Sequence, residues 1–172
     1  SFGGRLGYED AGNSANTQVV LHDYAAAPLI FETRGLPKSK EGQKDWKHSM
    51  DDYRGSQIGV VVQCEHGSVL STDEYEKTEV FGPDGKLIKT FLGGGNHFAN
   101  FLDAVRSRKR SDLNADVLDG HLSSALCHTG NISHRLGEPM AAKEILDSVA
   151  KNERLHDSVK RMLTHLKANG VD

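Results

Sequence analysis

The sequence is poor in cysteine and contains no long apolar run. Its two cysteines, Cys64 and Cys127, lie far apart and belong to no Cys-x-x-Cys pair. A disulfide framework is therefore excluded, and a reducing compartment is favoured. No apolar run approaches the roughly 18 residues that a membrane-spanning helix needs. The mean hydropathy is -0.52, and we expect no membrane partner.

The first residues lack the features of a signal peptide. Residues 1–5 contain no Met, and neither a charged n-region nor an apolar h-region is present. We therefore expect the chain to be part of a longer protein, any targeting segment of which lies before Ser1. The expected compartment is the cytoplasm, and the alternative is the periplasm if that upstream segment is an export signal.

The chain also lacks an excess of charge of either sign. It has 21 Lys+Arg against 24 Asp+Glu, which gives a formal net charge of -3. The basic run 106–110 is too short to form the positive surface that nucleic-acid binding requires, so no nucleic-acid partner is predicted. A chain of 172 residues with 37% hydrophobic and 26% charged residues is typical of a soluble globular protein of one domain.

Hydrophobic periodicity changes near residue 95. Before it, short runs rich in β-branched and aromatic residues predict strands, and Gly82-Pro83-Asp84-Gly85 predicts a hairpin turn between the last two. After it, apolar residues recur at helical spacing. The predicted strands are 18–22, 29–33, 58–64, 68–70, 78–81 and 86–91.

The helical half begins with Asn96 as a plausible N-cap. A second helix is expected over 116–136, ended by Gly137 and Pro139, and its apolar residues alternate at spacings of four and three. Two shorter helices follow at 141–151 and 157–167. The apolar residues of the two longer helices are Phe98, Phe101, Leu102 and Val105, then Leu118, Leu122, Ala125, Thr129, Ile132 and Leu136.

Strands followed by helices predict an α+β fold. We expect an open, largely antiparallel β-sheet with helices packed on one face, in a single domain over 1–172 that is strand-rich in 1–92 and helix-rich in 96–168. The polar segment 36–56 is the exception, because loops of that length are uncommon inside a compact domain. It is either a solvated insertion or a lid or interface arm, and its Asp51-Asp52 pair is interpreted as solvation.

The residues alone supply no catalytic machinery. His121 and His128 share a polar stripe of the second helix, but a zinc site needs ligands at i, i+4 or a third ligand in register, so no metal site is predicted. The run 93–95 of three glycines lacks the spacing of a phosphate-binding loop, so no cofactor site is predicted. Neither cysteine has the charged surroundings of a nucleophile, and no catalytic triad is present.

Several stretches taken together resemble the C-terminal domain of Gfo/Idh/MocA oxidoreductases, the glucose–fructose oxidoreductase and inositol dehydrogenase family. The likeness covers roughly residues 1–137. The stretches that carry it are GGRLGYEDAG (3–12), NTQVV (16–20), LIFETRGLP (29–37), GGGNHFANFLDAVRSRK (93–109), LNAD (113–116) and GHLSSALCHTGNIS (120–133).

The resemblance implies a longer enzyme in which a first, nucleotide-binding domain holds NAD or NADP. The second domain would form a wall of the substrate cleft and the subunit interface. The family's glycine fingerprint, its Glu-Lys-Pro segment and its Asp-x-x-x-His motif have no counterpart here. The chain thus resembles a second domain without cofactor site or catalytic residues, and none is assigned to it.

The resemblance implies that the longer protein transfers hydride between the nicotinamide and a hydroxyl carbon of a sugar or polyol. We expect the isolated chain to be inactive and to form a homo-oligomer through its sheet. The candidate substrate-binding residues are Arg34, His121 and His128, although a structural role is the favoured interpretation of each. The alternative is a non-catalytic binding or assembly module, and a self-sufficient hydrolase is disfavoured.

Overall fold

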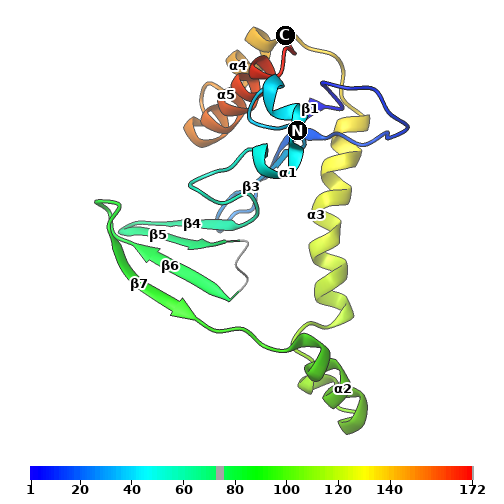
Figure 1. Ribbon diagram of the computed structural model, residues 1–172, viewed down its shortest axis with the longest axis vertical. Coiled ribbons are helices and arrows are strands. Elements are labelled where there is room, and N and C mark those ends of the chain that lie inside the picture. The colour runs from blue at the N-terminus through cyan, green and yellow to red at the C-terminus, as the bar shows by residue number, and fades with distance from the viewer. Residues whose placement is uncertain (73–75, 172) are drawn as a thin grey trace. The chain divides into compact units, whose positions relative to one another are not determined.

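The computed structural model describes residues 1–72 and 76–171, and the chain divides into two compact units. Unit 1 comprises residues 1–51 and 121–172, and unit 2 comprises residues 52–120. The change of pattern near residue 95 is confirmed, because the last strand ends at Leu92 and the longer helices follow it (Figure 1). The units do not coincide with the predicted strand-rich and helix-rich halves, since each combines strands and helices.

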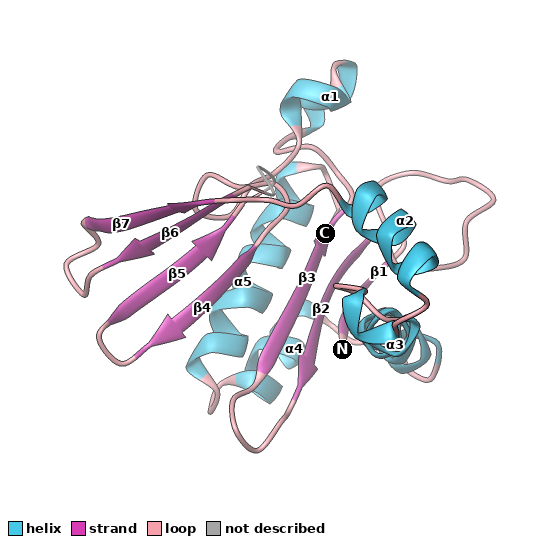
Figure 2. Cartoon of the chain, turned by 90° about the horizontal axis from the view of Figure 1, so that it is seen from below, coloured by secondary structure: helices cyan, strands magenta, loops and turns pink. Residues whose placement is uncertain are grey.

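Unit 1 is built on a three-stranded antiparallel sheet in the order β1-β2-β3. Its strands are β1 (Phe2–Gly4), β2 (Thr17–His22) and β3 (Leu29–Arg34) (Figure 2). In the register of β2 and β3, Val19 lies opposite Glu32. Because successive side chains of a strand point to opposite faces, Val19 belongs to one face of this sheet and Val20 to the other.

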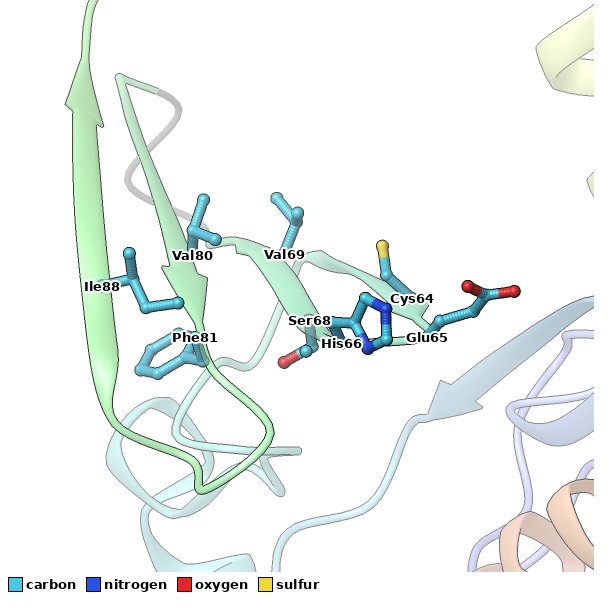
Figure 3. Close-up of a pocket in the computed structure, with 9 residues that line it drawn as sticks. Cys64, Glu65, His66, Ser68, Val69, Val80, Phe81 and Ile88 are labelled. Carbon is cyan, nitrogen blue, oxygen red and sulfur yellow. The ribbon is translucent and has the colours of Figure 1, made fainter.

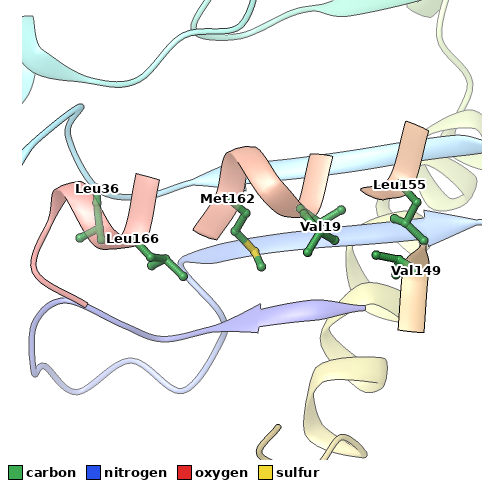
Figure 4. Close-up of a cluster of buried hydrophobic side chains, with 7 residues drawn as sticks. Val19, Leu36, Val149, Leu155, Met162 and Leu166 are labelled. Carbon is green, nitrogen blue, oxygen red and sulfur yellow. The ribbon is translucent and has the colours of Figure 1, made fainter. Parts of the chain in front are cut away.

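Helices α4 (Ala142–Val149) and α5 (Glu153–Ala168) pack on the Val19 face of that sheet. Helix α5 begins one turn before the predicted start at 157, because the Asn152 side chain accepts a hydrogen bond from the Leu155 amide (3.0 Å) and caps it there. Figure 4 shows the resulting core. Its buried members are Val19, Leu36, Val149, Leu155, Val159, Met162 and Leu166.

The opposite face of the three-stranded sheet is in contact with helix α3 (Val117–Arg135). The Gln18 side-chain amide donates to the Gly130 carbonyl (2.9 Å), and a Cβ placed on Gly130 would lie 3.0 Å from Cγ2 of Val20. Gly130 is therefore the point of close approach between helix and sheet. The prediction that helices cover one face only is corrected: this sheet has helices on both faces, because both faces of β2 carry buried side chains.

The segment 36–56 is not simply a solvated insertion. It contains a 3-10 helix η1 (Lys40–Lys44) and a short helix α1 (Trp46–Ser49), and its ends are joined by an isolated bridge between Pro37 and Met50. The interpretation of Asp51 as solvation is also corrected. Its carboxylate lies 3.1 Å from Nδ1 of His165, whose side chain is 3% exposed, so Asp51 is tied to α5.

Unit 2 contains a separate four-stranded antiparallel meander, β4-β5-β6-β7. Its strands are β4 (Val60–Cys64), β5 (Gly67–Ser71), β6 (Lys77–Phe81) and β7 (Leu87–Leu92). The predicted hairpin turn between β6 and β7 is confirmed: the Gly85 amide donates to the Gly82 carbonyl (3.0 Å). The antiparallel α+β prediction thus holds, but in two sheets instead of one.

Helix α2 (His97–Ser107) and the 3-10 helix η2 (Arg110–Asp112) complete unit 2. The predicted N-cap is confirmed, since the Asn96 side chain accepts a hydrogen bond from the Ala99 amide (3.0 Å). The polar side of α2 contacts the segment after it, because the Asn100 side-chain amide donates a hydrogen bond to the Asp112 carbonyl (2.7 Å). Its apolar stripe remains exposed, and α2 has no buried residue.

Candidate functional site

One face of the four-stranded sheet of unit 2 carries five apolar side chains in two neighbouring rows. In the strand register, Val62 lies opposite Val69, and Val69 lies opposite Val80. A second row crosses the four strands two residues further along each strand, on the same face. Val60 and Phe91 form its ends, and Ser71 and Thr78 lie between them. We call this surface the valine face, and it consists of Val60, Val62, Val69, Val80 and Phe91.

The valine face is open within unit 2. Val60 is 59% exposed, Val62 50% and Phe91 51%. Lys89 lies on the same face, with its Nζ 4.4 Å from the centroid of the Phe91 ring. Contiguous exposed apolar surface of this kind marks interaction sites in soluble proteins, because water is a poor solvent for it.

The other face of the same sheet is partly covered by unit 2 itself. Leu70 on that face is only 5% exposed. The Arg54 guanidinium lies 5.9 Å from the Phe81 ring centroid and donates a hydrogen bond to the Ser68 hydroxyl (3.2 Å). The segment that precedes β4 therefore supplies cover to one face, whereas the valine face is left to meet solvent or a partner.

A shallow hollow of about 340 Å³ lies at the turn between β4 and β5. Figure 3 shows that the Cys64 sulfur points to the same side as Val69 and Val80, whereas the His66 ring points elsewhere. A thiol nucleophile needs a base within hydrogen-bond reach, and this arrangement does not pair the two. The lining residues are Cys64, Glu65, His66, Gly67, Ser68, Val69, Val80, Phe81 and Ile88.

Within residues 1–72 and 76–171, no group of three or more His, Cys, Asp or Glu side chains is placed to hold a metal ion. The two cysteines are exposed and free. The described residues therefore offer no built metal centre, and we assign no cofactor contact to them.

Arg34, a predicted substrate-binding residue, lies inside an ionic cluster between β3 and α5. Its Nη2 donates to the Glu32 carboxylate (2.6 Å), and Arg161 of α5 donates to the same carboxylate (2.9 Å). The Arg34 side chain is 12% exposed. Its guanidinium is thus already bound to a carboxylate of its own chain, on the α5 face of the sheet.

The two arginines of this cluster are perturbed in opposite directions. Burial lowers the pKa of Arg34, with Glu32 acting against it and the neighbouring Arg161 adding to it. Burial also acts to lower the pKa of Arg161, but hydrogen bonds to Glu32 and Asp157 outweigh that effect and raise it. Both guanidinium groups stay charged at neutral pH, because a free arginine titrates only above about pH 12. The cluster acts as an electrostatic link between β3 and α5.

His121 and His128, the other predicted substrate-binding residues, lie exposed on α3. At 100° per residue they project from the side of α3 opposite to Gly130, which contacts the sheet. Since α5 and α3 pack on opposite faces of that sheet, unit 1 does not bring Arg34 together with the two histidines. Their role in substrate binding stays a prediction.

Sequence reasoning missed the four buried polar atoms that lack a hydrogen-bond partner among the described residues. The His165 ring bonds Asp51 through Nδ1 while its Nε2 has no partner, and three further atoms of unit 1 share that condition. No spacing signal links Asp51 to His165, because the two residues are far apart in the sequence. The further atoms are Thr17 Oγ1, His22 Nε2 and Asn131 Oδ1.

Comparison with known proteins leaves the resemblance found in the sequence without an independent match. No family model, no curated protein and no solved structure matches the chain. Among the described residues, no helix combines the length and the apolar character needed to cross a membrane.

Proposed function

We propose that the chain is the second domain of a Gfo/Idh/MocA-type oxidoreductase, in which it serves as the assembly surface and as one wall of the substrate cleft. The longer protein would use NAD or NADP to oxidise or reduce a hydroxyl carbon of a sugar or polyol, in the cytoplasm or, with an upstream export signal, in the periplasm. The observation that carries the proposal is the valine face, and the sequence resemblance supplies the enzyme class.

The physical argument for assembly is the exposure of this face. Burying apolar surface yields roughly 25 cal/mol per Å², and a stable interface buries about 800 Å² on each partner. A second copy presents an identical valine face, so two sheets packed face to face would cover both at once, about 10 Å apart. We therefore assign the homo-oligomer contact to this face.

The assembly part is tested by sedimentation equilibrium of the chain and of a Val62→Lys variant. We expect the unaltered chain to self-associate and Val62→Lys to be monomeric, because an ammonium group buried without a partner is costly. Gln63→Lys, on the other face of the same strand, is the matched control and should associate as before. A monomeric unaltered chain at all concentrations would contradict the assignment.

The enzyme part is tested separately by the reading frame that precedes Ser1. We expect it to encode a nucleotide-binding βαβ unit and, near the junction, an acidic residue four positions before a histidine. The isolated chain should give no heat on calorimetric titration with NADH. If the preceding frame lacks a nucleotide-binding unit, the valine face still favours the second candidate function, a non-catalytic assembly module.

A further inference from the structure

Helix α3 carries a second apolar surface that unit 1 leaves uncovered. Along one side of the helix, apolar residues alternate at spacings of four and three, and we call this row the α3 seam. Three of its members are more than half exposed: Leu122 (57%), Ile132 (55%) and Leu136 (79%). Within unit 1 the row is Leu122, Ala125, Thr129, Ile132 and Leu136.

The seam does not face the sheet on which α3 packs. At 100° per residue, Ile132 lies about 160° and Leu122 about 80° around the helix from Gly130, the buried residue of α3. Leu136 continues the row beyond the last helical residue, because its amide still donates to the Ile132 carbonyl (3.0 Å). The helix is therefore held by its glycine side and presents its apolar row outward.

The spacing of the seam indicates what covers it. A row that alternates by four and three repeats every seven residues, which is the spacing at which side chains of one α-helix fit between those of another. The polar member, Thr129, is already satisfied: its hydroxyl donates to the Ala125 carbonyl (2.8 Å). Burying it beside another helix therefore leaves no unpaired hydroxyl.

The charges beside the seam restrict the chemistry of that second helix. On the flank away from the sheet, His121, His128 and Arg135 follow one another at seven-residue intervals and are exposed. On the flank toward the sheet lie Leu126 and Ser133, and the Ser133 hydroxyl accepts a hydrogen bond from the N-terminal amine (3.1 Å). One flank thus offers nitrogen donors, and the other is engaged by unit 1 itself.

A second copy of α3 fits this surface poorly. In an antiparallel pair the two rows would face each other, and neither offers a carboxylate to the Arg135 guanidinium of the other copy. In a parallel pair the donor row would need the Leu126–Ser133 flank of the other copy, which is turned toward its own sheet. Carboxylates are the groups that complement such a row, because they accept hydrogen bonds from imidazole and guanidinium alike.

We propose that the α3 seam is a docking site for an amphipathic α-helix from outside this chain, whose apolar row is flanked by Asp or Glu residues. The seam supplies the apolar contact, and His121, His128 and Arg135 favour a partner with carboxylates beside its apolar row. The docking site depends on neither the valine face nor the enzyme class, so its test is independent of the test of the proposed function.

The test uses two fluorescent peptides of about 20 residues, longer than the roughly four turns of the seam. Both carry leucine or isoleucine at spacings of four and three, one with glutamate and the other with lysine at every flanking position. We expect the glutamate peptide to bind the full chain in fluorescence anisotropy at low salt, and the lysine peptide to bind at least about tenfold more weakly.

Leu122→Glu and Ile132→Glu should each abolish binding of the glutamate peptide, because they place a carboxylate in the apolar contact. Both positions are exposed, so folding should be kept, which circular dichroism checks. Val117→Glu, the same kind of change at an 83% exposed position off the seam, should bind as the unaltered chain does. Arg135→Glu should narrow the preference for glutamate over lysine.

Three outcomes would overturn the inference. The first is no binding of the glutamate peptide, and the second is equal binding of the two peptides. The third is self-association that Leu122→Glu abolishes and Val62→Lys leaves intact, since the seam would then be covered by a second copy. Loss of self-association in Val62→Lys alone bears on the valine face and leaves this inference unaffected.

Discussion

In unit 1 the side chains of Val19 and Val159 are fully buried, whereas in unit 2 Val60 and Val62 are 59% and 50% exposed. Both units contain antiparallel strands rich in β-branched residues, so the difference does not come from composition. It comes from cover: two layers of helix enclose the sheet of unit 1, and the valine face of unit 2 has none. Unit 1 buries its apolar side chains within itself, whereas unit 2 leaves those of the valine face exposed.

The largest expected effect lies in the core of unit 1. Met162 is 1% exposed, and Met162→Ala should lower the free energy of unfolding by about 2–5 kcal/mol, because it removes buried apolar contact and leaves a cavity. Urea denaturation followed by the fluorescence of Trp46, the single tryptophan, reports on this unit. Leu92→Ala in unit 2, at 80% exposed, should change little, within about 0.5 kcal/mol. Equal losses of unfolding free energy in the two variants would contradict the difference in burial between the units.

A smaller loss is expected from the ionic cluster of unit 1. Glu32→Ala leaves the guanidinium of Arg34, 12% exposed, without its carboxylate. Removing one partner of a buried pair costs about 3–5 kcal/mol, and partial exposure of this cluster should reduce that to about 2 kcal/mol. Asp157→Ala removes a 64% exposed partner of Arg161 and should be nearly neutral in the same urea denaturation.

Unit 2 should differ from unit 1 in its dependence on protein concentration. If the valine face is covered by a second copy, a tenfold rise in concentration should raise the unfolding midpoint of unit 2 by roughly 5 °C. Hydrogen exchange at the β4–β7 amides measures it, and Val62→Lys should remove the dependence. A midpoint of unit 2 that does not move with concentration in the unaltered chain would contradict the comparison.

The smallest expected effect is the loss of stability at low pH. Each unit has an aspartate of lowered pKa, so this loss should be common to both. The Arg110 guanidinium (2.7 Å) and the Leu118 amide hold the pKa of Asp116 in unit 2 below its usual value. A folded pKa below the unfolded one gives stability that is present above about pH 4 and is lost as pH falls through the folded value. Asp116→Asn should lack this acid-dependent loss in urea denaturation between about pH 2 and 6.

Asp10 in unit 1 provides the matched control for that experiment. Its pKa is lowered in the same way, by the Arg5 guanidinium and the Gly12 amide. Asp10→Asn should therefore lose an acid-dependent contribution of the same sign and over the same pH range. If only one of the two variants changes how the free energy of unfolding falls at low pH, the two carboxylates do not contribute alike and the expectation is wrong.

Local signals in the sequence were read correctly where the chemistry is local. The turn at Gly82 and Gly85 and the cap at Asn96 each depend on residues within four positions of one another. Long-range partners left no such trace. The interpretation of Asp51 as solvation is wrong because Asp51 meets His165. The sequence likewise gives no sign that Arg161 reaches the Glu32 carboxylate beside Arg34, whose role in substrate binding stays a prediction.

The α3 seam also shows that local sequence patterns do not reveal long-range contacts. The alternation of Leu122, Thr129 and Ile132 predicted an amphipathic helix, and α3 is one. Periodicity states that a helix has an apolar side but not what that side meets. Only the close approach of Gly130 to Val20 revealed that the sheet takes the glycine side and leaves the apolar row free.

By itself the sequence determined the elements: strands to Leu92, helices after His97, and an antiparallel α+β class, because strand, turn and helix signals act between near neighbours. The tertiary structure alone decided that the strands form two sheets, that Arg34 and the α3 histidines lie on opposite faces, and which apolar surfaces remain open. Those outcomes depend on contacts between residues distant in the chain, and burial is settled only when all of them form together.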